Sequence, residues 1–260
     1  MSRVAIVTGA ARGIGAATVV ALANEGYTVL AVDVCSDEPR IPYPMGTWEE
    51  LDGVIATAGP RARAVVADAT DPRALAGVVA DVERDHGGLD VVVAAAGVIA
   101  GGAPQWEVPP EQEQAVIDVC LAGTLTAARV SIPALLRRPE PRQGRFLAVA
   151  SAAATRGLPM LAAYCAAKAG VAGLIRALAV ELRGTGVTAN AVSPGSTRTV
   201  MLEQSARLYG LSGPEEFARQ QPIDRLLIPA EVAAWLVFLA GSAASGVTGA
   251  ILLVDGGLSA

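Results

Sequence analysis

The sequence predicts an α/β protein built on a doubly wound parallel sheet within a single domain. Two observations predict this class. Short aliphatic runs alternate with stretches of helical length, and the first run leads directly into a glycine-rich turn. Strands that are apolar on both faces are typical of parallel sheets covered by helices on both sides. We therefore expect one open sheet enclosed between two helical layers.

The alternation extends along the whole chain, without an internal repeat or a low-complexity linker. Strands are expected at 4–7, 28–32, 64–67, 89–93, 146–149, 187–192 and 251–254. Helices are expected at 16–24, 72–84, 111–132, 162–182 and 230–239. We interpret residues 1–260 as one domain with an extended loop at about 35–62 and a substrate lid at about 200–223.

Composition favours a homo-oligomer and gives no support for nucleic-acid binding. Only 17% of the residues are charged and 52% are apolar, so much of the helix surface is expected to avoid water. The net charge of -5 comes without any run of Lys or Arg, which a nucleic-acid partner would require. Small residues that permit close helix contact are concentrated in the helix expected at 162–182, namely Ala166, Ala167, Ala169, Gly170, Ala172 and Gly173.

The cysteines and the hydropathy pattern indicate a cytoplasmic protein without a metal site. Cys35, Cys120 and Cys165 are widely spaced and form no CxxC pair, which suits reduced thiols. No signal-peptide pattern opens the chain. The uncharged run Val232–Val254 is long enough to span a bilayer, but its Gly and Ser residues favour a helix, a turn and a buried strand. We expect no membrane association.

The glycine-rich turn after the first strand predicts a dinucleotide site. Gly9, Gly13 and Gly15 let the backbone turn sharply and approach a pyrophosphate, and Arg12 and Ile14 lie in the same turn. The helix that follows offers free N–H groups and a positive dipole end to that anion. A glycine turn alone is weak evidence, but strand, turn and helix together predict a Rossmann-type fold.

Asp33 predicts NAD rather than NADP as the cofactor. It ends the second strand, beside Val34, where a carboxylate accepts hydrogen bonds from the adenosine ribose and repels a 2′-phosphate. The NADP alternative stays open because Arg12, in the glycine turn, could hold a 2′-phosphate. Asp68 and Ala69 follow the third strand and are expected near the adenine; the alternative for Asp68 is a helix N-cap before Pro72.

Ser151, Tyr164 and Lys168 are the candidate catalytic residues. Tyr164 and Lys168 are four residues apart and share one helix face, and Ser151 follows the fifth strand. An ammonium about 5 Å from the phenol is expected to lower the tyrosine pKa by about two units, which prepares it for proton transfer to or from an alcohol. A Tyr-x-x-x-Lys pair is common by chance, so its combination with Ser151 carries the prediction.

With these motifs, the chain resembles the short-chain dehydrogenase/reductase family from Thr8-Gly9 to Val254–Gly257. Further matching stretches are Ala191–Gly195 and Val247–Gly249. The resemblance implies an NAD-dependent alcohol dehydrogenase or ketoreductase. It also implies a dimer or a tetramer, and it favours the tetramer. It also implies that Lys168 holds the nicotinamide ribose. The other residues that it places around the cofactor are Ala95, Gly97, Tyr164, Pro194, Gly195, Thr197 and Thr199.

Two positions depart from the family pattern. Ala94-Ala95-Ala96-Gly97 stands where the family has Asn-Asn-Ala-Gly, so an amide that stabilises the sheet is missing. Cys120 stands where the family has its fourth catalytic residue, an Asn, and a thiol is a poor hydrogen-bond donor. These departures put a proton relay through Lys168 in question and leave open a degenerate member that binds NAD(H) as a sensor or scaffold.

The loop after Asp33 resembles the insertion of mycofactocin-associated, carveol dehydrogenase-like members of the family. It carries Ile41-Pro42-Tyr43-Pro44, Thr47 and Glu49-Glu50-Leu51 and is longer than usual. That resemblance implies that the loop covers a tightly held NAD, which mycofactocin or another external carrier reoxidises. The alternatives are a tolerated surface insertion and ordinary, freely exchanging NAD(H).

The segment Val200–Ile223 is expected to cover the substrate. It carries Met201, Leu202, Leu208, Tyr209, Leu211 and Phe217, which favours a secondary or small apolar alcohol and its carbonyl counterpart. The alternative is that these side chains only pack the lid onto the core.

Overall fold

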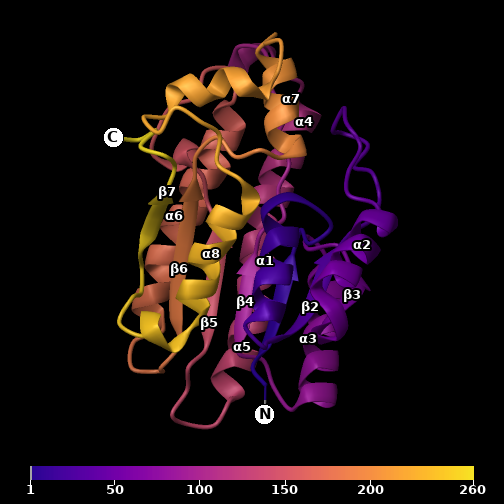
Figure 1. Ribbon diagram of the computed structural model, residues 1–260, viewed down its shortest axis with the longest axis vertical. Helices are drawn as coiled ribbons and strands as arrows, with labels where there is room; N and C mark the ends of the chain where they lie inside the picture. The colour runs from indigo at the N-terminus through magenta and orange to yellow at the C-terminus, as the bar shows by residue number, and fades with distance from the viewer. Residues whose placement is uncertain (1) are drawn as a thin grey trace.

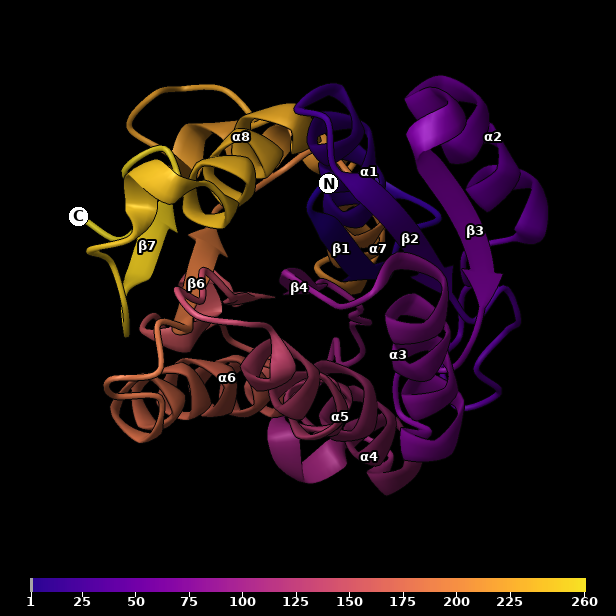
Figure 2. The ribbon, with the colours of Figure 1, turned by 90° about the horizontal axis from the view of Figure 1, so that it is seen from below.

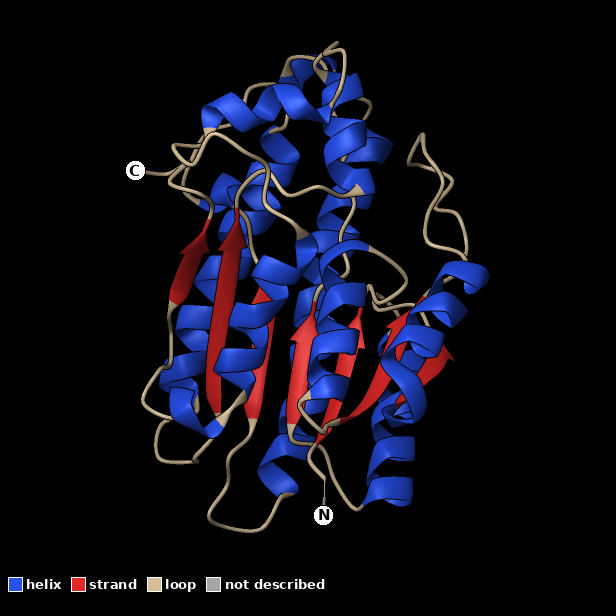
Figure 3. Cartoon of the chain, viewed as in Figure 1, coloured by secondary structure: helices blue, strands red, loops and turns tan. Residues whose placement is uncertain are grey.

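The computed structural model describes residues 2–260 as one seven-stranded parallel sheet in the order β3-β2-β1-β4-β5-β6-β7. All strands point the same way in Figure 3. In that strand order, their bounds are Ala62–Val66, Thr28–Asp33, Val4–Thr8, Val91–Ala94, Arg145–Val149, Thr188–Pro194 and Ile251–Val254. The seven expected strands are therefore present, with ends that differ by a few residues.

Helices cover both faces of the sheet, as the view along the strands in Figure 2 shows. One face packs against α1 (Gly13–Asn24), α2 (Trp48–Ala58) and α8 (Pro229–Ala240). The other packs against α3 (Pro72–His86), α5 (Gly123–Arg137) and α6 (Ala162–Glu181). Each face has its own buried cluster of aliphatic side chains, so the doubly wound Rossmann-type prediction is confirmed.

The extended loop predicted at about 35–62 is shorter than expected. Residues 48–58 form α2, which begins with a capping box: the Thr47 hydroxyl accepts from Glu50 N–H, and the Glu50 carboxylate accepts from Thr47 N–H. A short 3₁₀ turn, Gly59–Arg61, then leads into β3. The irregular part is residues 34–47, which we call the strap.

The helix predicted at 111–132 is interrupted. It consists of α4 (Pro110–Ile117), one π-helical turn (Asp118–Ala122) and α5. A π turn inserts one extra residue into the helical ladder, and such turns are frequent at functional sites. Here the turn carries Cys120, which is completely buried.

The uncharged run Val232–Val254 folds as the end of α8, a turn and β7. β7 is less buried than predicted, because it forms the edge of the sheet, and Leu253 is 51% exposed. Two other helical stretches, Pro110–Arg137 and Ala162–Glu181, are long and apolar enough to cross a membrane by length and composition. Both contain residues that pack against the sheet.

The strand order determines where a ligand can bind. The chain crosses from one side of β1 to the other between β3 and β4, so loops diverge above the carboxyl ends of β1 and β4. The strap and the lid, with α7 (Val200–Leu208), both rise above this edge of the sheet in Figure 1.

Candidate active site

A cavity of about 600 Å³ opens at the carboxyl edge of the sheet, within the usual size range of ligand pockets. It receives residues from the glycine turn, the strap, the ends of β2, β4, β5 and β6, helix α6 and the lid. The predicted residues that line it are Gly9, Arg12, Gly13, Ile14, Gly15, Asp33, Val34, Ala95, Gly97, Ser151, Tyr164, Lys168, Pro194, Gly195, Thr197 and Thr199.

The glycine turn forms a cradle that side chains would fill. Gly9 has a φ of 67°, and a Cβ there would lie 2.6 Å from the Ala96 Cα. A Cβ on Gly15 would collide with the carbonyl oxygen of Gly9. Helix α1 begins at Gly13 without a side-chain cap or an acidic residue in its first turn, which leaves its first N–H groups free for an anion.

Asp33 lies at the end of this cradle where the adenosine is expected. Its Oδ2 accepts a 2.9 Å hydrogen bond from Ala11 N–H in the glycine turn, and its Oδ1 accepts one of 3.4 Å from Cys35 N–H. The carboxylate therefore lines the cavity and also holds the turn in place.

Asp68 and Ala69 lie outside the set of residues that line the cavity. The alternative role of Asp68 as a helix N-cap is wrong, because Asp71 caps α3 by accepting from Arg73 N–H. Asp68 instead accepts from the backbone and the hydroxyl of Thr70. Asp71 immediately precedes Pro72, the first helical residue, so it is the residue in the capping position.

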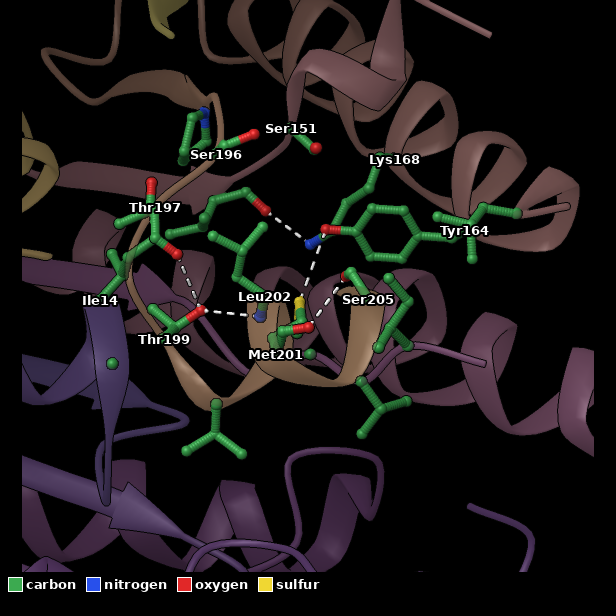
Figure 4. A pocket seen from close by; sticks show the side chains of 18 of the residues that line it. Ile14, Ser151, Tyr164, Lys168, Ser196, Thr197, Thr199, Met201, Leu202 and Ser205 are labelled. Carbon is green, nitrogen blue, oxygen red and sulfur yellow. Dashed lines mark hydrogen bonds between the residues drawn. The ribbon is translucent and has the colours of Figure 1, made fainter. Parts of the chain in front are cut away.

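Ser151, Tyr164 and Lys168 meet at the opposite end of the cavity (Figure 4). Ser151 begins a 3₁₀ turn, Ala152–Ala154, by accepting from Ala153 N–H. Lys168 Nζ lies 5.7 Å from the centre of the Tyr164 ring and donates a 2.8 Å hydrogen bond to the Val149 carbonyl. The first turns of α6 and the end of β5 thus hold the three side chains together.

The protein's own groups do not lower the Tyr164 pKa as predicted. Burial raises the pKa of the Tyr164 phenol above its ordinary value, and hydrogen bonding with Ser151 acts in the opposite direction. Burial lowers the pKa of Lys168. Both charged forms are disfavoured because the site excludes water.

Thr8 and Cys120 provide contacts at the two positions that depart from the family pattern. The Thr8 hydroxyl accepts from Ala95 N–H at 3.2 Å and from Ala96 N–H at 3.4 Å, which ties the end of β4 to β1. Cys120 Sγ donates to the Val98 carbonyl, and Val98 N–H donates to Cys120 Sγ. The loop after β4 is therefore anchored without either amide.

The end of β6, where the nicotinamide is expected, is shaped by tight backbone packing. A Cβ on Gly195 would collide with the side-chain oxygen of Gln221. Thr199 caps α7 by accepting from Leu202 N–H, and its hydroxyl donates to the Thr197 carbonyl. Pro194 and these threonines line the cavity. Figure 4 shows the two threonines beside Ile14 of the glycine turn, across from Tyr164.

The strap supplies cavity-lining residues that were not among the predicted site residues: Tyr43, Met45 and Gly46. The Tyr43 hydroxyl accepts a 2.9 Å hydrogen bond from Ile99 N–H, and Arg12 Nη2 donates to the Pro44 carbonyl. Arg40 pairs with Asp118 in the π turn at 2.7 Å. The alternating apolar residues of Ile41-Pro42-Tyr43 were the signal in the sequence, since Ile41 and Tyr43 are both buried.

The lid divides its apolar residues between the cavity and the core. Met201, Leu202, Tyr209, Leu211 and Phe217 line the cavity. Leu208 does not; its side chain packs against Gly102. Met201 reaches across the cavity, where its sulfur accepts a 3.8 Å hydrogen bond from the Tyr164 hydroxyl (Figure 4). Phe217 also belongs to a buried cluster, so the lid packs onto the core as well as lining the cavity.

The cavity wall also contains a charged residue that sequence reasoning missed, Arg156. It follows the turn that Ser151 begins, and no motif in the sequence distinguishes it from other surface arginines. Its neighbours in the cavity wall include Gly157, Leu158 and Pro159.

Comparisons with known proteins agree with this geometry. A family model described as enoyl-(acyl carrier protein) reductase matches residues 9–259. The chain is 37% identical to a cis-4-hydroxycyclohexanecarboxylate dehydrogenase of Sinomonas cyclohexanicum, over 99% of this chain and 97% of that protein. It is 34% identical to a (-)-trans-carveol dehydrogenase of Rhodococcus erythropolis, over 98% and 96% of the two chains.

A solved structure extends the similarity to three dimensions. The crystal structure of a carveol dehydrogenase from Mycobacterium avium in complex with NAD superimposes with a TM-score of 0.92. It shares 31% identity with this chain and covers 98% of it, and 97% of that chain is matched.

Proposed function

The chain belongs to the short-chain dehydrogenase/reductase family, and on that basis we propose that it is an NAD-dependent oxidoreductase that interconverts a secondary or small apolar alcohol and its carbonyl compound. One observation carries the proposal: Ser151, Tyr164 and Lys168 meet at one end of a cavity whose other end carries the glycine cradle and Asp33. Relatives named NAD-dependent or solved with NAD support the choice of cofactor.

The residues present fit a dinucleotide. The uncapped start of α1 and the cradle around Gly9 and Gly15 suit a pyrophosphate, Asp33 suits a ribose, and Thr197 and Thr199 line the nicotinamide end. NAD⁺ held there would supply the redox chemistry, as the acceptor of the hydride from the alcohol carbon, together with the positive charge of its nicotinamide.

Tyr164 is the general acid and base in this proposal. Its phenolate takes the hydroxyl proton of an alcohol, and its phenol returns a proton to the oxygen in the reductive direction. Ser151 donates a hydrogen bond to the same substrate oxygen and orients it. Lys168, fixed by the Val149 carbonyl, is the neighbouring group whose positive charge would offset the effect of burial on the phenol in this proposal.

The strap supports the proposal that NAD stays on the enzyme and is reoxidised in place, by mycofactocin or another external carrier. Its buried side chains and its contacts with Ile99 and Asp118 tie it down beside the cofactor cavity. A tolerated surface insertion does not require such anchoring. Freely exchanging NAD(H) is the competing hypothesis.

Apolar lining and the names of relatives suggest the substrate class. Both the hydroxycyclohexanecarboxylate and the carveol dehydrogenase are named for ring alcohols. We propose a ring alcohol or ketone for this chain, processed by a cytoplasmic homotetramer.

The test begins with the mass and absorbance spectrum of any nucleotide that survives purification. Turnover is then measured with a panel of ring alcohols, NAD⁺ and an artificial electron acceptor. We expect turnover that is lost in Tyr164→Phe while the fold and nucleotide binding persist. Nucleotide binding without turnover of any alcohol or ketone would instead favour a sensor or scaffold.

A further inference from the structure

The charges that line the cavity are unevenly distributed. Asp33 is the only carboxylate among the lining residues, and it lies at the adenosine end. The lining cations are Arg12, Arg156 and Lys168. Arg12 belongs to the glycine turn and donates to the strap, and Lys168 donates to Val149. Arg156 alone contributes charge to the substrate lobe, which we define by Leu158, Pro159, Tyr209, Leu211, Phe217 and Leu258.

Arg156 is positioned by the element that positions Ser151. Its backbone N–H donates to the Ala152 carbonyl over 2.9 Å, which extends the turn that Ser151 begins. Its Nη1 donates to the carbonyl oxygen of Leu258, in the segment after β7. The Leu258 contact ties the guanidinium to another residue that lines the substrate lobe, while Arg156 as a whole is exposed.

The positive charge of Arg156 is not neutralised within the described chain. Its recorded side-chain acceptor is a neutral carbonyl, and none of the nine ion pairs among residues 2–260 includes it. A guanidinium has five N–H donors, so one contact leaves donors for a planar, bidentate acceptor. The rest of the lobe is largely apolar and contains no carboxylate that would repel an anion.

We propose that Arg156 makes this enzyme selective for alcohols or ketones that carry a carboxylate remote from the reacting carbon. The inference rests on the proposed function and deepens it. One guanidinium matches one carboxylate. A phosphate dianion would require further cations. Of the other two that line the cavity, Arg12 belongs to the glycine turn and Lys168 is engaged with Val149 beside Tyr164. In the bound substrate, Arg156 holds the carboxylate while the carbinol oxygen faces Ser151 and Tyr164.

The test uses substrate pairs that differ only in charge. The isomeric 2-, 3- and 4-hydroxycyclohexanecarboxylates are compared with the corresponding carboxamides, which have nearly the same shape. For the wild type, we expect kcat/KM for at least one carboxylate to exceed that of its carboxamide by roughly tenfold, as expected for a charge-assisted hydrogen bond at a partly exposed site. Salt should reduce this ratio.

Variants assign the effect to Arg156. Arg156→Gln should bring the ratio close to one, and Arg156→Lys should retain part of it. The matched control is Arg183→Gln, which removes the same charge just beyond the far end of α6, about 30 Å along the helix from Tyr164. The control should keep the wild-type ratio. Circular dichroism and thermal melts verify that each variant folds.

A binding measurement separates this inference from the proposed function. Calorimetry with cyclohexanecarboxylate and cyclohexanecarboxamide, in the presence of NAD⁺, needs no turnover. Tighter binding of the carboxylate that depends on Arg156 supports the inference even where no alcohol is oxidised. Equal affinities for the two ligands, or an Arg156→Gln effect that is the same for both, would overturn it. Oxidation of neutral ring alcohols without a charge preference would leave only the proposed function standing.

Discussion

The Cys120 thiol and the backbone of Val98 form a reciprocal pair of hydrogen bonds. Sγ donates to the Val98 carbonyl over 3.2 Å, and Val98 N–H donates to Sγ over 3.4 Å. The pair joins the π-helical turn Asp118–Ala122 to the loop after β4, close to Gly97 at the cavity wall. Cys120 therefore has a structural role at the position where the family resemblance implies a catalytic Asn.

Replacing Cys120 by Asn should speed proton transfer, provided that chemistry limits the rate. The amide oxygen can accept from Val98 N–H and the amide nitrogen can donate to its carbonyl, both more strongly than a thiol. The measurement is single-turnover reduction of bound NAD⁺ by an alcohol across pH. Because the site is fully buried, the larger side chain can cost about 1–3 kcal/mol of stability, so thermal melts accompany the kinetics.

Cys120→Ala serves as the control, since it removes the thiol without adding an amide. If folded Cys120→Asn protein is no faster than wild type and its pH profile is unchanged, an amide at this position contributes nothing to the relay.

Alcohol oxidation should accelerate with rising pH. Burial raises the pKa of Tyr164, so the phenolate that removes the alcohol proton is scarce near neutral pH and increases by about tenfold per pH unit below that pKa. Carbonyl reduction uses the neutral phenol and should not share this rise. Steady-state kcat/KM from pH 6 to 10 provides the measurement.

Tyr164→Phe should be at least about 100-fold slower and lack this pH dependence. An oxidation rate in the wild type that is flat over the whole range would show that Tyr164 deprotonation does not control the reaction.

Tyr43→Phe should release the cofactor faster. Loss of the hydroxyl leaves the Ile99 N–H without its recorded acceptor, at a cost of about 1–3 kcal/mol in the closed strap. The dissociation rate of NAD, followed by stopped-flow dilution, is expected to rise by roughly tenfold or more. Tyr27→Phe is the matched control, because Tyr27 also has a hydrogen-bonded hydroxyl but lies among residues that do not line the cavity.

The Tyr43 contact should be constant over the working pH range. Burial raises the pKa of Tyr43 to about 12. Its neutral form therefore stabilises the fold fully below the usual tyrosine pKa of about 10, and this stabilisation is lost as pH rises toward 12. A strap that loosens between pH 6 and 9 in wild type would have to be opened by another group.

Cofactor preference should shift toward NADP when the negative charge of Asp33 is removed and a positive charge is added beside it. Asp33→Ala with Val34→Arg removes the repulsion and adds a partner for a 2′-phosphate. The structure adds a refinement: Asp33 also accepts from Ala11 N–H, so Asp33→Asn with Val34→Arg should shift preference with less damage to the glycine turn. Dissociation constants of both nucleotides are measured for the two double variants. Tighter binding of NADP than NAD by wild type would refute the role assigned to Asp33.

The protein should be an oligomer, with the outer face of α6 as one contact. Ala162, Ala166, Ala169 and Gly173 are exposed along that face, and Val180 is 69% exposed. Ala167 and Ala172, predicted as contact residues, are instead buried within the chain's own core. Light scattering at micromolar concentration should give a tetramer, and Ala169→Glu should lower its mass. A monomeric wild type would contradict this prediction.

The sequence by itself determined the sheet, its two helical layers and the glycine cradle. These features depend on local patterns: buried parallel strands are continuous apolar runs, and a turn toward a phosphate requires glycine. Tyr164 and Lys168 could be placed together for the same reason, since residues four positions apart on a helix share a face. The family motifs added Ser151 and the residues at the end of β6 to the predicted site.

Only the tertiary structure decided which loop contacts reach the site. The bond between Tyr43 and Ile99 joins residues 56 positions apart, and nothing in either segment specifies the other as its partner. The same holds for Arg156 and Leu258, which are 102 positions apart. The pKa of Tyr164 is raised, whereas the sequence predicted that Lys168 would lower it. Burial depends on all the residues that pack around a group, and the spacing of two residues identifies only one of those neighbours.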